Sequence, residues 1–195
     1  MQHVDYSIME YSLPSTRGFP VEFAALGFLI ECPMHGYALR ERIAEGLGPL
    51  WQVASSQLYQ VLHRLEAQEY VFREELAESK GPSKYVYSST ELGRSSFWTW
   101  ALASVDAMRD VRVEFAAKLY FTRRLRPSAV DTLIENQLDA QERMAAYLAS
   151  TSRSGSDDAI LNEAWNAMQM STVENFSSWL RSHRSQLATP KESTP

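Results

Sequence analysis

The chain has 195 residues and a formal net charge of −5, with 45% hydrophobic and 22% charged residues, an ordinary composition for a globular protein. No apolar run approaches the roughly 20 residues that cross a bilayer, and the first residues lack the basic and apolar segments of a secretory signal. One cysteine excludes an internal disulfide framework and fits a reducing compartment, so we expect a cytoplasmic protein. The lack of a long apolar run predicts no membrane partner. The acidic balance argues against indiscriminate binding of nucleic acids.

The first part of the chain predicts an extension followed by two helices. Residues 1–20 contain two prolines and a glycine and are expected to be the extension. Residues 21–32 are nearly all apolar, which predicts a helix buried on most sides and a buried thiol at Cys32. The run 36–46 predicts a second helix. Three of its residues are expected to point inward: Tyr37, Leu39 and Ile43.

Residues 52–69 predict a third, amphipathic helix. Leu58, Leu62 and Leu65 recur at helical spacing and form its apolar stripe. The opposite side carries hydrogen-bonding side chains and no acid, and Ser55 or Ser56 stands where an N-cap is expected. Such a helix can rest on a core and place its polar face in a groove, although an ordinary core helix with a solvated face would show the same pattern.

After Glu69 the pattern changes to the alternation typical of strands. Residues 70–76 and 84–90 are rich in aromatic and β-branched residues and flank a Gly-Pro turn, which predicts a β-hairpin. Three helices and a hairpin follow one another in this order in a winged helix-turn-helix. Thr90 then caps a further helix, on which Phe97, Trp98 and Trp100 cannot all share one side. One of them should therefore meet a second domain, a partner chain or a ligand.

The rest of the chain predicts helices only, over residues 111–124, 127–150 and 159–187. The last helix carries an apolar stripe at alternating spacings of three and four: Leu161, Trp165, Met168, Thr172, Phe176 and Trp179. A stripe of this length predicts helix pairing, within the chain or across a dimer. The fold class is therefore mainly α with a small β-hairpin, a winged helix-turn-helix domain followed by an all-α dimerisation domain. The predicted divisions are an extension over 1–20, a DNA-binding domain over 21–107, a helical dimerisation and effector domain over 108–187, and a disordered tail over 188–195.

Three motifs resemble the DNA-binding domain of PadR-family transcriptional regulators. They are H-G-Y at 35–37, S-x-x-Q-L-Y-x-x-L-x-R-L-E at 55–66 and Y-S-x-T-E-x-G at 87–93, while VEFAAKLYF at 113–121 and the final helix resemble the larger helical domain of one branch. The chain departs from the family at Gln60, where a proline is usual, and in its less basic hairpin loop. The resemblance implies a homodimeric regulator, mostly a repressor, that binds a near-palindromic operator and is released by a small aromatic effector such as a phenolic acid. It implies no cofactor.

The candidate DNA-binding residues have the chemistry for this task. Gln pairs with adenine and Arg with guanine in the major groove, whereas Ser and Tyr suit phosphates or thymine methyls, and the hairpin lysines suit phosphate or the minor groove. Arg64 comes late in its helix, so the DNA backbone is its expected partner. The candidates are Ser55, Ser56, Gln57, Tyr59, Gln60, His63, Arg64, His35, Tyr37, Lys80 and Lys84.

An effector pocket is predicted in the C-terminal half, although core and dimer packing explains most aromatic residues there. Trp165, Met144 and Tyr147 would line it, with Asn162 as a polar contact. A carboxylate ligand would also need a cation, which Lys118, Arg143 or Arg109 would supply.

Other functions find less support in the sequence. Cys32 and His35 lie three residues apart, but no third His or Cys lies near them to complete a metal site. No Gly-rich phosphate loop, Ser-His-Asp order or HExxH motif appears, so no enzymatic activity is expected; a Cys32-based enzyme would need an exposed, reactive thiol. The alternative to a DNA-binding regulator is a module whose helical half captures a hydrophobic compound or a partner protein.

Overall fold

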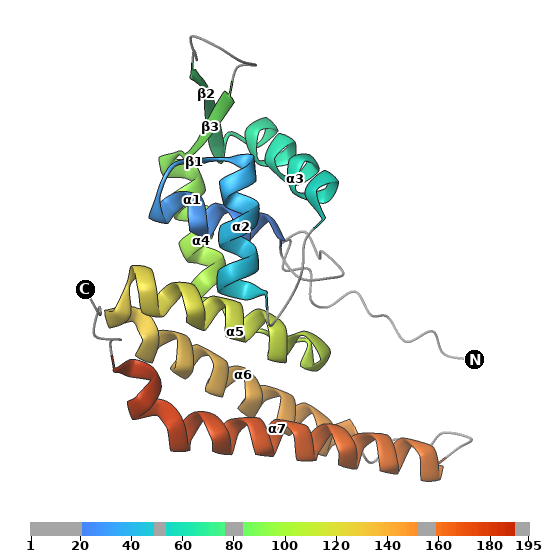
Figure 1. Cartoon of the computed structure of the whole chain (residues 1–195). Coiled ribbons are helices and arrows are strands. Elements are labelled where there is room, and N and C mark those ends of the chain that lie inside the picture. The colour runs from blue at the N-terminus through green and yellow to red at the C-terminus, as the bar shows by residue number, and fades with distance from the viewer. Residues whose placement is uncertain (1–20, 49–53, 77–83, 152–158, 190–195) are drawn as a thin grey trace.

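The computed structural model describes residues 21–48, 54–76, 84–151 and 159–189. Figure 1 shows short helices and a small sheet stacked on three long helices, α5, α6 and α7, which lie in layers. In chain order the elements are α1 (Val21–Glu31), β1 (Met34–His35), α2 (Gly36–Leu47), α3 (Ser55–Ala67), β2 (Val71–Leu76), β3 (Lys84–Ser89), α4 (Glu91–Leu102), α5 (Met108–Leu125), the 3₁₀ turn η1 (Pro127–Ala129), α6 (Val130–Thr151) and α7 (Ala159–Ala188). We call α1–α4 with the strands the N-terminal half and α5–α7 the three-helix layer.

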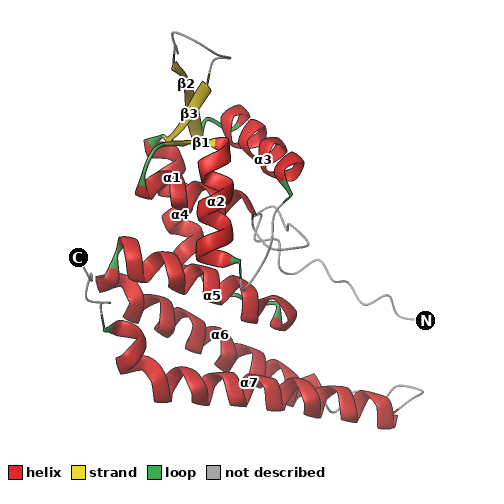
Figure 2. Cartoon of the chain, viewed as in Figure 1, coloured by secondary structure: helices red, strands yellow, loops and turns green. Residues whose placement is uncertain are grey.

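The predicted hairpin is confirmed, and it forms part of a three-stranded antiparallel sheet. β3 pairs with β2 along its whole length, from Val71 opposite Ser89 to Leu76 opposite Lys84. The sequence did not indicate β1, which pairs with the other edge of β3. Figure 2 shows the sheet rising from the helices, and the β2 residues after Val71 are exposed. The hairpin therefore projects as a wing beside α3, and the predicted fold class is confirmed.

Helix α5 belongs to two hydrophobic cores. Its residues Ala117 and Phe121 pack in the core of the N-terminal half, where Phe121 meets Phe28 edge to face at 5.0 Å between ring centroids. Val111 and Phe115, earlier on the same helix, pack in the core of the three-helix layer. The division after residue 107 stays a prediction, since the helix that follows it shares residues with both cores.

A capped turn fixes the start of α4 against the wing. The Thr90 hydroxyl accepts a hydrogen bond from Gly93 N at 3.0 Å and donates one to Glu69 O at 2.7 Å, while Thr90 N donates to Tyr70 O. A Cβ on Gly93 would lie 2.1 Å from the Tyr70 carbonyl oxygen, so only glycine fits there. The Y-S-x-T-E-x-G motif thus encodes the exit from the wing, as predicted for the cap at Thr90.

Helix α3 ends in a Schellman motif with an unusual residue at its turn. Tyr70 N donates to Leu65 O and Glu69 N to Glu66 O, which closes the last turn of the helix. Glu69 has a φ of 58°, in the left-handed region that glycine favours.

Replacing Glu69 with glycine is therefore expected to stabilise the protein by about 1 kcal/mol, because the Cβ penalty of the left-handed conformation disappears. For a chain of this size the melting temperature should rise by roughly 2–4 °C in calorimetry. Glu69→Ala keeps the Cβ and serves as the matched control, with little expected change. Equal stabilisation by both substitutions would point to the lost charge as the cause.

Several local predictions are wrong. The N-cap of α3 is Ala54, which makes no side-chain hydrogen bond, so neither Ser55 nor Ser56 caps the helix. Cys32 is exposed, because it lies just past the end of α1. Tyr37 is 58% exposed, whereas Leu39, Ile43 and Leu47 of α2 face the core. Ala188 still belongs to α7, whereas the extension over residues 1–20 and the tail from 190 lie outside the described residues.

Candidate DNA interface and effector residues

The outer face of α3 is polar and exposed, and it carries no acid between Ser55 and Leu65. Leu58, Val61, Leu62 and Leu65 are buried and hold the helix on the core. The predicted residues of the other face are all exposed: Ser55, Ser56, Gln57, Tyr59, Gln60, His63 and Arg64. The structure therefore presents the seven α3 candidates together on one surface, beside the wing (Figure 1).

The end of α3 is tied to its neighbours by ion pairs. Arg64 Nε donates to Glu22 Oε1 of α1 at 3.1 Å, across 42 residues of sequence. Glu66 accepts from Arg73 Nε of β2 at 3.0 Å, and His63 Nδ1 lies 4.0 Å from the same carboxylate. Arg64 can thus bind a phosphate only by leaving or sharing Glu22.

The H-G-Y motif at residues 35–37 supports the beginning of α3. The His35 Nδ1 atom accepts a hydrogen bond from Ala38 N at 3.1 Å and caps α2. A Cβ on Gly36 would lie 2.9 Å from Cε1 of Tyr59, so the glycine makes room for the Tyr59 ring. The half-buried His35 therefore has a structural task, while Tyr37 and Tyr59 keep exposed rings.

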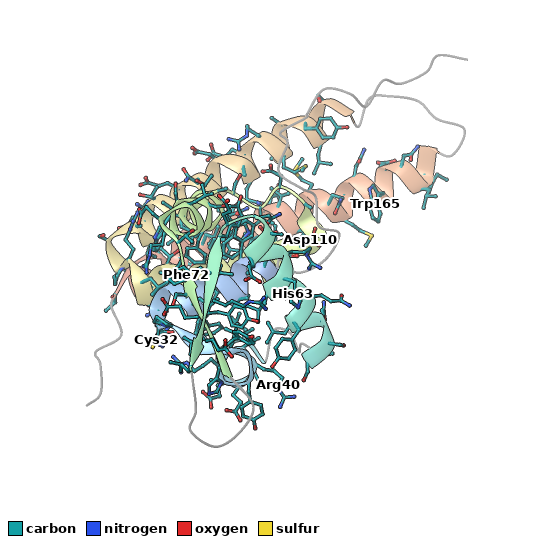
Figure 3. The ribbon with its side chains drawn as sticks, turned by 90° about the horizontal axis from the view of Figure 1, so that it is seen from above. Cys32, Arg40, His63, Phe72, Asp110 and Trp165 are labelled. Carbon is teal, nitrogen blue, oxygen red and sulfur yellow. The ribbon has the colours of Figure 1, made fainter. Side chains whose placement is uncertain are left out.

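Two arginines that the sequence analysis missed lie at this surface. Arg40 Nη1 donates to Ser55 Oγ at 3.5 Å, and the Arg40 guanidinium lies over the Tyr37 ring at 5.6 Å. Arg73 stands between α3 and the wing, with its guanidinium 4.8 Å from the Tyr85 ring centroid. Figure 3 shows Arg40 and His63 on the same side of the molecule as the wing. In the sequence, the position of Arg40 one turn after Tyr37 could have indicated that it lies at this surface. Nothing in the sequence indicated the same for Arg73.

The two predicted wing lysines lie at or beyond the edge of the described part of the wing. Lys80 lies outside the described residues, and Lys84 is the first residue of β3, where only its backbone is described. The described wing also carries Phe72 and Leu76, both exposed, and the acidic Glu74 and Glu75 of β2. The local charge of the wing therefore depends on its loop.

The predicted effector residues fall into two places. Trp165 and Asn162 on α7, and Tyr147 and Arg143 on α6, are exposed at the far ends of these helices, with Met144 half-buried between them. Figure 3 shows Trp165 on the outer part of α7. Lys118 does not join them, because its side chain is 1% exposed and its ammonium binds Ala103 O at 2.8 Å and Glu114 Oε1 at 3.0 Å. The Arg109 side chain lies outside the described part of the structure.

The N-terminal part of the predicted stripe on α7 is exposed within the chain, whereas Phe176 is half-buried and packs on Phe115. Leu161, Trp165 and Met168 are 64%, 59% and 65% exposed. The buried residues Val173, Ser177 and Leu180 lie roughly a third of a turn away around the helix, at 100° per residue. On the side toward α6, Arg184 bonds Asp131 at 2.7 Å and Glu135 at 2.6 Å. The packing of α7 on α6 therefore leaves Leu161, Trp165 and Met168 largely exposed.

Two further findings bear on other kinds of function. In the residues that the structure describes, no group of three or more His, Cys, Asp or Glu could hold a metal ion. None of the described helices has the length and apolar character needed to traverse a membrane.

Comparisons with known proteins match part of the chain to a family of transcriptional regulators. Residues 25–98 match the model of the "Transcriptional regulator PadR-like family". The chain is 25% identical over 122 residues to the negative transcriptional regulator PadR of Bacillus subtilis. The aligned region covers 63% of this chain and 67% of that protein.

Solved structures with similar folds include two of Bacillus subtilis PadR. The complex with operator DNA is 22% identical, covers 86% of this chain and 98% of that one, and has a TM-score of 0.44. The complex with p-coumaric acid is 22% identical, covers 87% and 99%, and has a TM-score of 0.39. Members of the matched family are transcriptional regulators and not enzymes, which confirms the prediction of no enzymatic activity. Residues 25–98 are therefore a PadR-like domain, the domain type of a family of transcriptional regulators.

Proposed function

We propose that this regulator binds DNA in a sequence-specific way as a homodimer on a near-palindromic operator. The observation that carries the proposal is the exposed polar face of α3, which has no acid between Ser55 and Leu65, beside a projecting wing. In the proposed complex Gln57 and Gln60 read base edges, and Ser55, Ser56 and Tyr59 contact phosphates or thymine methyls. The uncapped N-terminus of α3 adds backbone N–H groups that favour phosphate.

The cations around α3 would position the helix. Arg40 and Tyr37 stand beside Ser55, where a phosphate next to the groove would pass. Lys80 and Lys84 are proposed to follow the DNA backbone from the wing, His63 to lie along the groove, and Arg64 to exchange Glu22 for a phosphate. Because these cations would release counterions from the phosphates, the affinity should fall as the salt concentration rises. The net charge of −5 opposes binding, so the affinity should also depend on pairing two such surfaces.

The exposed stripe on α7 is proposed as the dimer face. A second copy packing on Trp165 and Met168 would bury an apolar surface that the chain leaves in water. In the dimer the two α3 helices would enter successive major grooves about 34 Å apart.

Repression and release by an effector complete the proposal. The name of the 25% identical Bacillus subtilis relative, a negative regulator, supports repression. Release by a small aromatic molecule such as a phenolic acid follows from the motif resemblance, and a ligand beside Trp165, Tyr147 and Asn162 would need the partner copy to enclose it. Such a ligand acts only through different affinities for the DNA-competent and DNA-incompetent dimers. Acting on DNA would place the protein in the cytoplasm.

The test is selection of DNA from a random pool, followed by operator binding of Gln57→Ala and Gln60→Ala. Each substitution should weaken specific binding about 10- to 100-fold, because a bidentate base contact discriminates by about 1–3 kcal/mol. Binding to unrelated DNA should not change. Gln186→Ala, at an exposed position of α7, is the matched control. Unchanged sequence preference in both α3 variants would refute the assignment of α3, and no specific binding at low salt would favour the alternative binding module.

A further inference from the structure

The carboxylate of Glu22 reaches the exposed face of α3, which carries no acid of its own between Ser55 and Leu65. Arg64 donates to Glu22 Oε1 through both Nε and Nη2, at 3.1 and 2.5 Å. About half of the Arg64 side chain is exposed, whereas most of the Glu22 side chain is covered. The guanidinium therefore remains accessible from the α3 face, while a carboxylate from α1 balances its charge.

Glu22 holds this position through the start of α1. It lies in the first turn of the helix, where the backbone N–H groups favour a negative charge. On its two sides Val21 is buried in the core, and Phe23 stacks on Trp100 with the ring centroids 4.9 Å apart. The backbone that presents the carboxylate is thus fixed, so Glu22 cannot follow Arg64 when the arginine turns towards a phosphate.

The two ends of α3 therefore offer different charges to DNA. Beside the first turn, Arg40 donates to Ser55 Oγ at 3.5 Å and lies 5.6 Å from the centroid of the Tyr37 ring, and both of these groups are neutral. In the last turn, Arg64 already has an anionic partner. A phosphate beside Arg40 replaces neutral contacts, whereas a phosphate beside Arg64 must displace or share a carboxylate.

Competition with Glu22 reduces what Arg64 can add to DNA binding. An ion pair at the protein surface is weak, so a phosphate can break it, but the free energy of the broken pair is subtracted from that of the new contact. The Glu22 carboxylate also stays where the phosphate arrives, and like charges at close range repel each other. Glu22 therefore opposes binding in two ways, by holding the cation and by repelling the phosphate.

We propose that Glu22 is an internal competitor for phosphate, which limits the affinity of α3 for any DNA. The inference rests on the proposed function, because Arg64 meets a phosphate only when α3 enters a major groove. A phosphate contact reads no base, so Glu22 weakens binding to the operator and to unrelated DNA by the same factor. The base contacts of Gln57 and Gln60 then supply a larger share of the affinity for the operator.

Titration of the full chain with the selected operator and with an unrelated duplex, over a series of salt concentrations, tests the role of Glu22. Glu22→Gln should bind both DNAs about threefold more tightly per subunit, which corresponds to about 0.7 kcal/mol, and about tenfold more tightly as a dimer. The plot of log affinity against log salt concentration should become steeper by up to about 0.9 per subunit, because Arg64 then neutralises a phosphate in full.

Glu142→Gln is the matched control. It also removes one exposed carboxylate that binds an arginine, Arg181 at 3.1 Å, but this pair joins α6 and α7, away from α3 (Figure 1). Its DNA affinity should stay close to that of the wild type. The gain from Glu22→Gln should largely disappear in an Arg64→Gln background, where no guanidinium remains to be released. Thermal melting of each variant checks that the fold is intact.

Three results would overturn the inference: operator binding by Glu22→Gln that is no tighter than that of Glu142→Gln, an equal gain in the Arg64→Gln background, or a gain on the operator that unrelated DNA does not share. A wild-type protein that binds no DNA even at low salt would overturn the proposed function, and this inference with it. DNA binding by the wild type without a gain in Glu22→Gln would overturn the inference alone.

Discussion

Replacing Trp165 with glutamate is expected to convert the proposed dimer to monomers at micromolar concentration. The indole is 59% exposed in the chain and stands between Leu161 and Met168 of the α7 stripe, which are also exposed. In the proposed dimer the substitution removes an aromatic anchor and buries a carboxylate among apolar side chains, each costing about 2 kcal/mol or more. Operator affinity should fall at least about 100-fold, equivalent to about 2.7 kcal/mol, because a monomer engages only one half-site.

Sedimentation equilibrium and operator titration together measure this effect. Thermal stability of the monomer should stay nearly constant, since the side chain is exposed there. Leu92→Glu provides the matched control, because Leu92 is a similarly exposed apolar residue (53%) on α4, away from the stripe. If both Trp165→Glu and Met168→Glu stay dimeric, the dimer must form through another surface.

The second large effect is expected at Lys118, which holds the N-terminal half to the three-helix layer. Its ammonium bonds Glu114 Oε1 and Ala103 O, and lies 5.3 Å from the centroid of the Trp100 ring. Methionine would keep most of the volume and remove the charge. Lys118→Met should lower the free energy of unfolding by about 3 kcal/mol, because the partly buried Glu114 carboxylate loses its cation. The melting temperature should fall by roughly 6–12 °C.

A double variant separates the charge from the packing. In Lys118→Met/Glu114→Gln no unpaired carboxylate remains, and the amide oxygen can still accept from Trp100 Nε1 as Glu114 does at 3.0 Å. The double variant should therefore be more stable than Lys118→Met alone. A Lys118→Met protein within about 0.5 kcal/mol of the wild type would show that the pair contributes nothing.

The same lysine gives the stability a pH dependence of known sign. Burial lowers the pKa of Lys118 below 10.5, against the opposing effect of Glu114. The unfolded chain holds this proton up to about pH 10.4, so between the folded pKa and that pH the unfolded state binds more protons. The free energy of unfolding contributed by this group therefore rises with pH in that window. Urea titrations across the alkaline range should show the wild type gaining stability relative to Lys118→Met.

Features set by local sequence could be predicted well. Leu58, Leu62 and Leu65 at helical spacing fixed which side of α3 is buried, and the alternation on both sides of Gly81-Pro82 identified the wing. Thr90 was identified as a cap from its residue type and its place before a helical pattern. Each of these depends on neighbours within a few residues, which is what period and turn chemistry describe.

Features that depend on distant segments could not be predicted. Arg64 pairs with Glu22 across 42 residues of sequence. Lys118, which the sequence suggested as a ligand cation, instead binds the Ala103 carbonyl and the Glu114 carboxylate. Trp98 lines a hollow with Arg126 and Asn136, which only the packing of α4 against α5 and α6 brings near. The crowding of Phe97, Trp98 and Trp100 indicated that one ring must face outward, but not which ring or what it would meet.

Because α5 contributes residues to both hydrophobic cores, the two halves of such regulators cannot be exchanged freely between relatives. One part of this helix packs Phe121 against the rings of Phe28 and Phe97 in the N-terminal half. Another part packs Phe115 against the ring of Phe176 in the three-helix layer. A chimaera that takes its N-terminal half from one relative and its three-helix layer from another must break one of these two fits, wherever the junction near α5 is placed. New operator specificities should therefore arise more readily by substitutions on α3 than by exchange of whole halves.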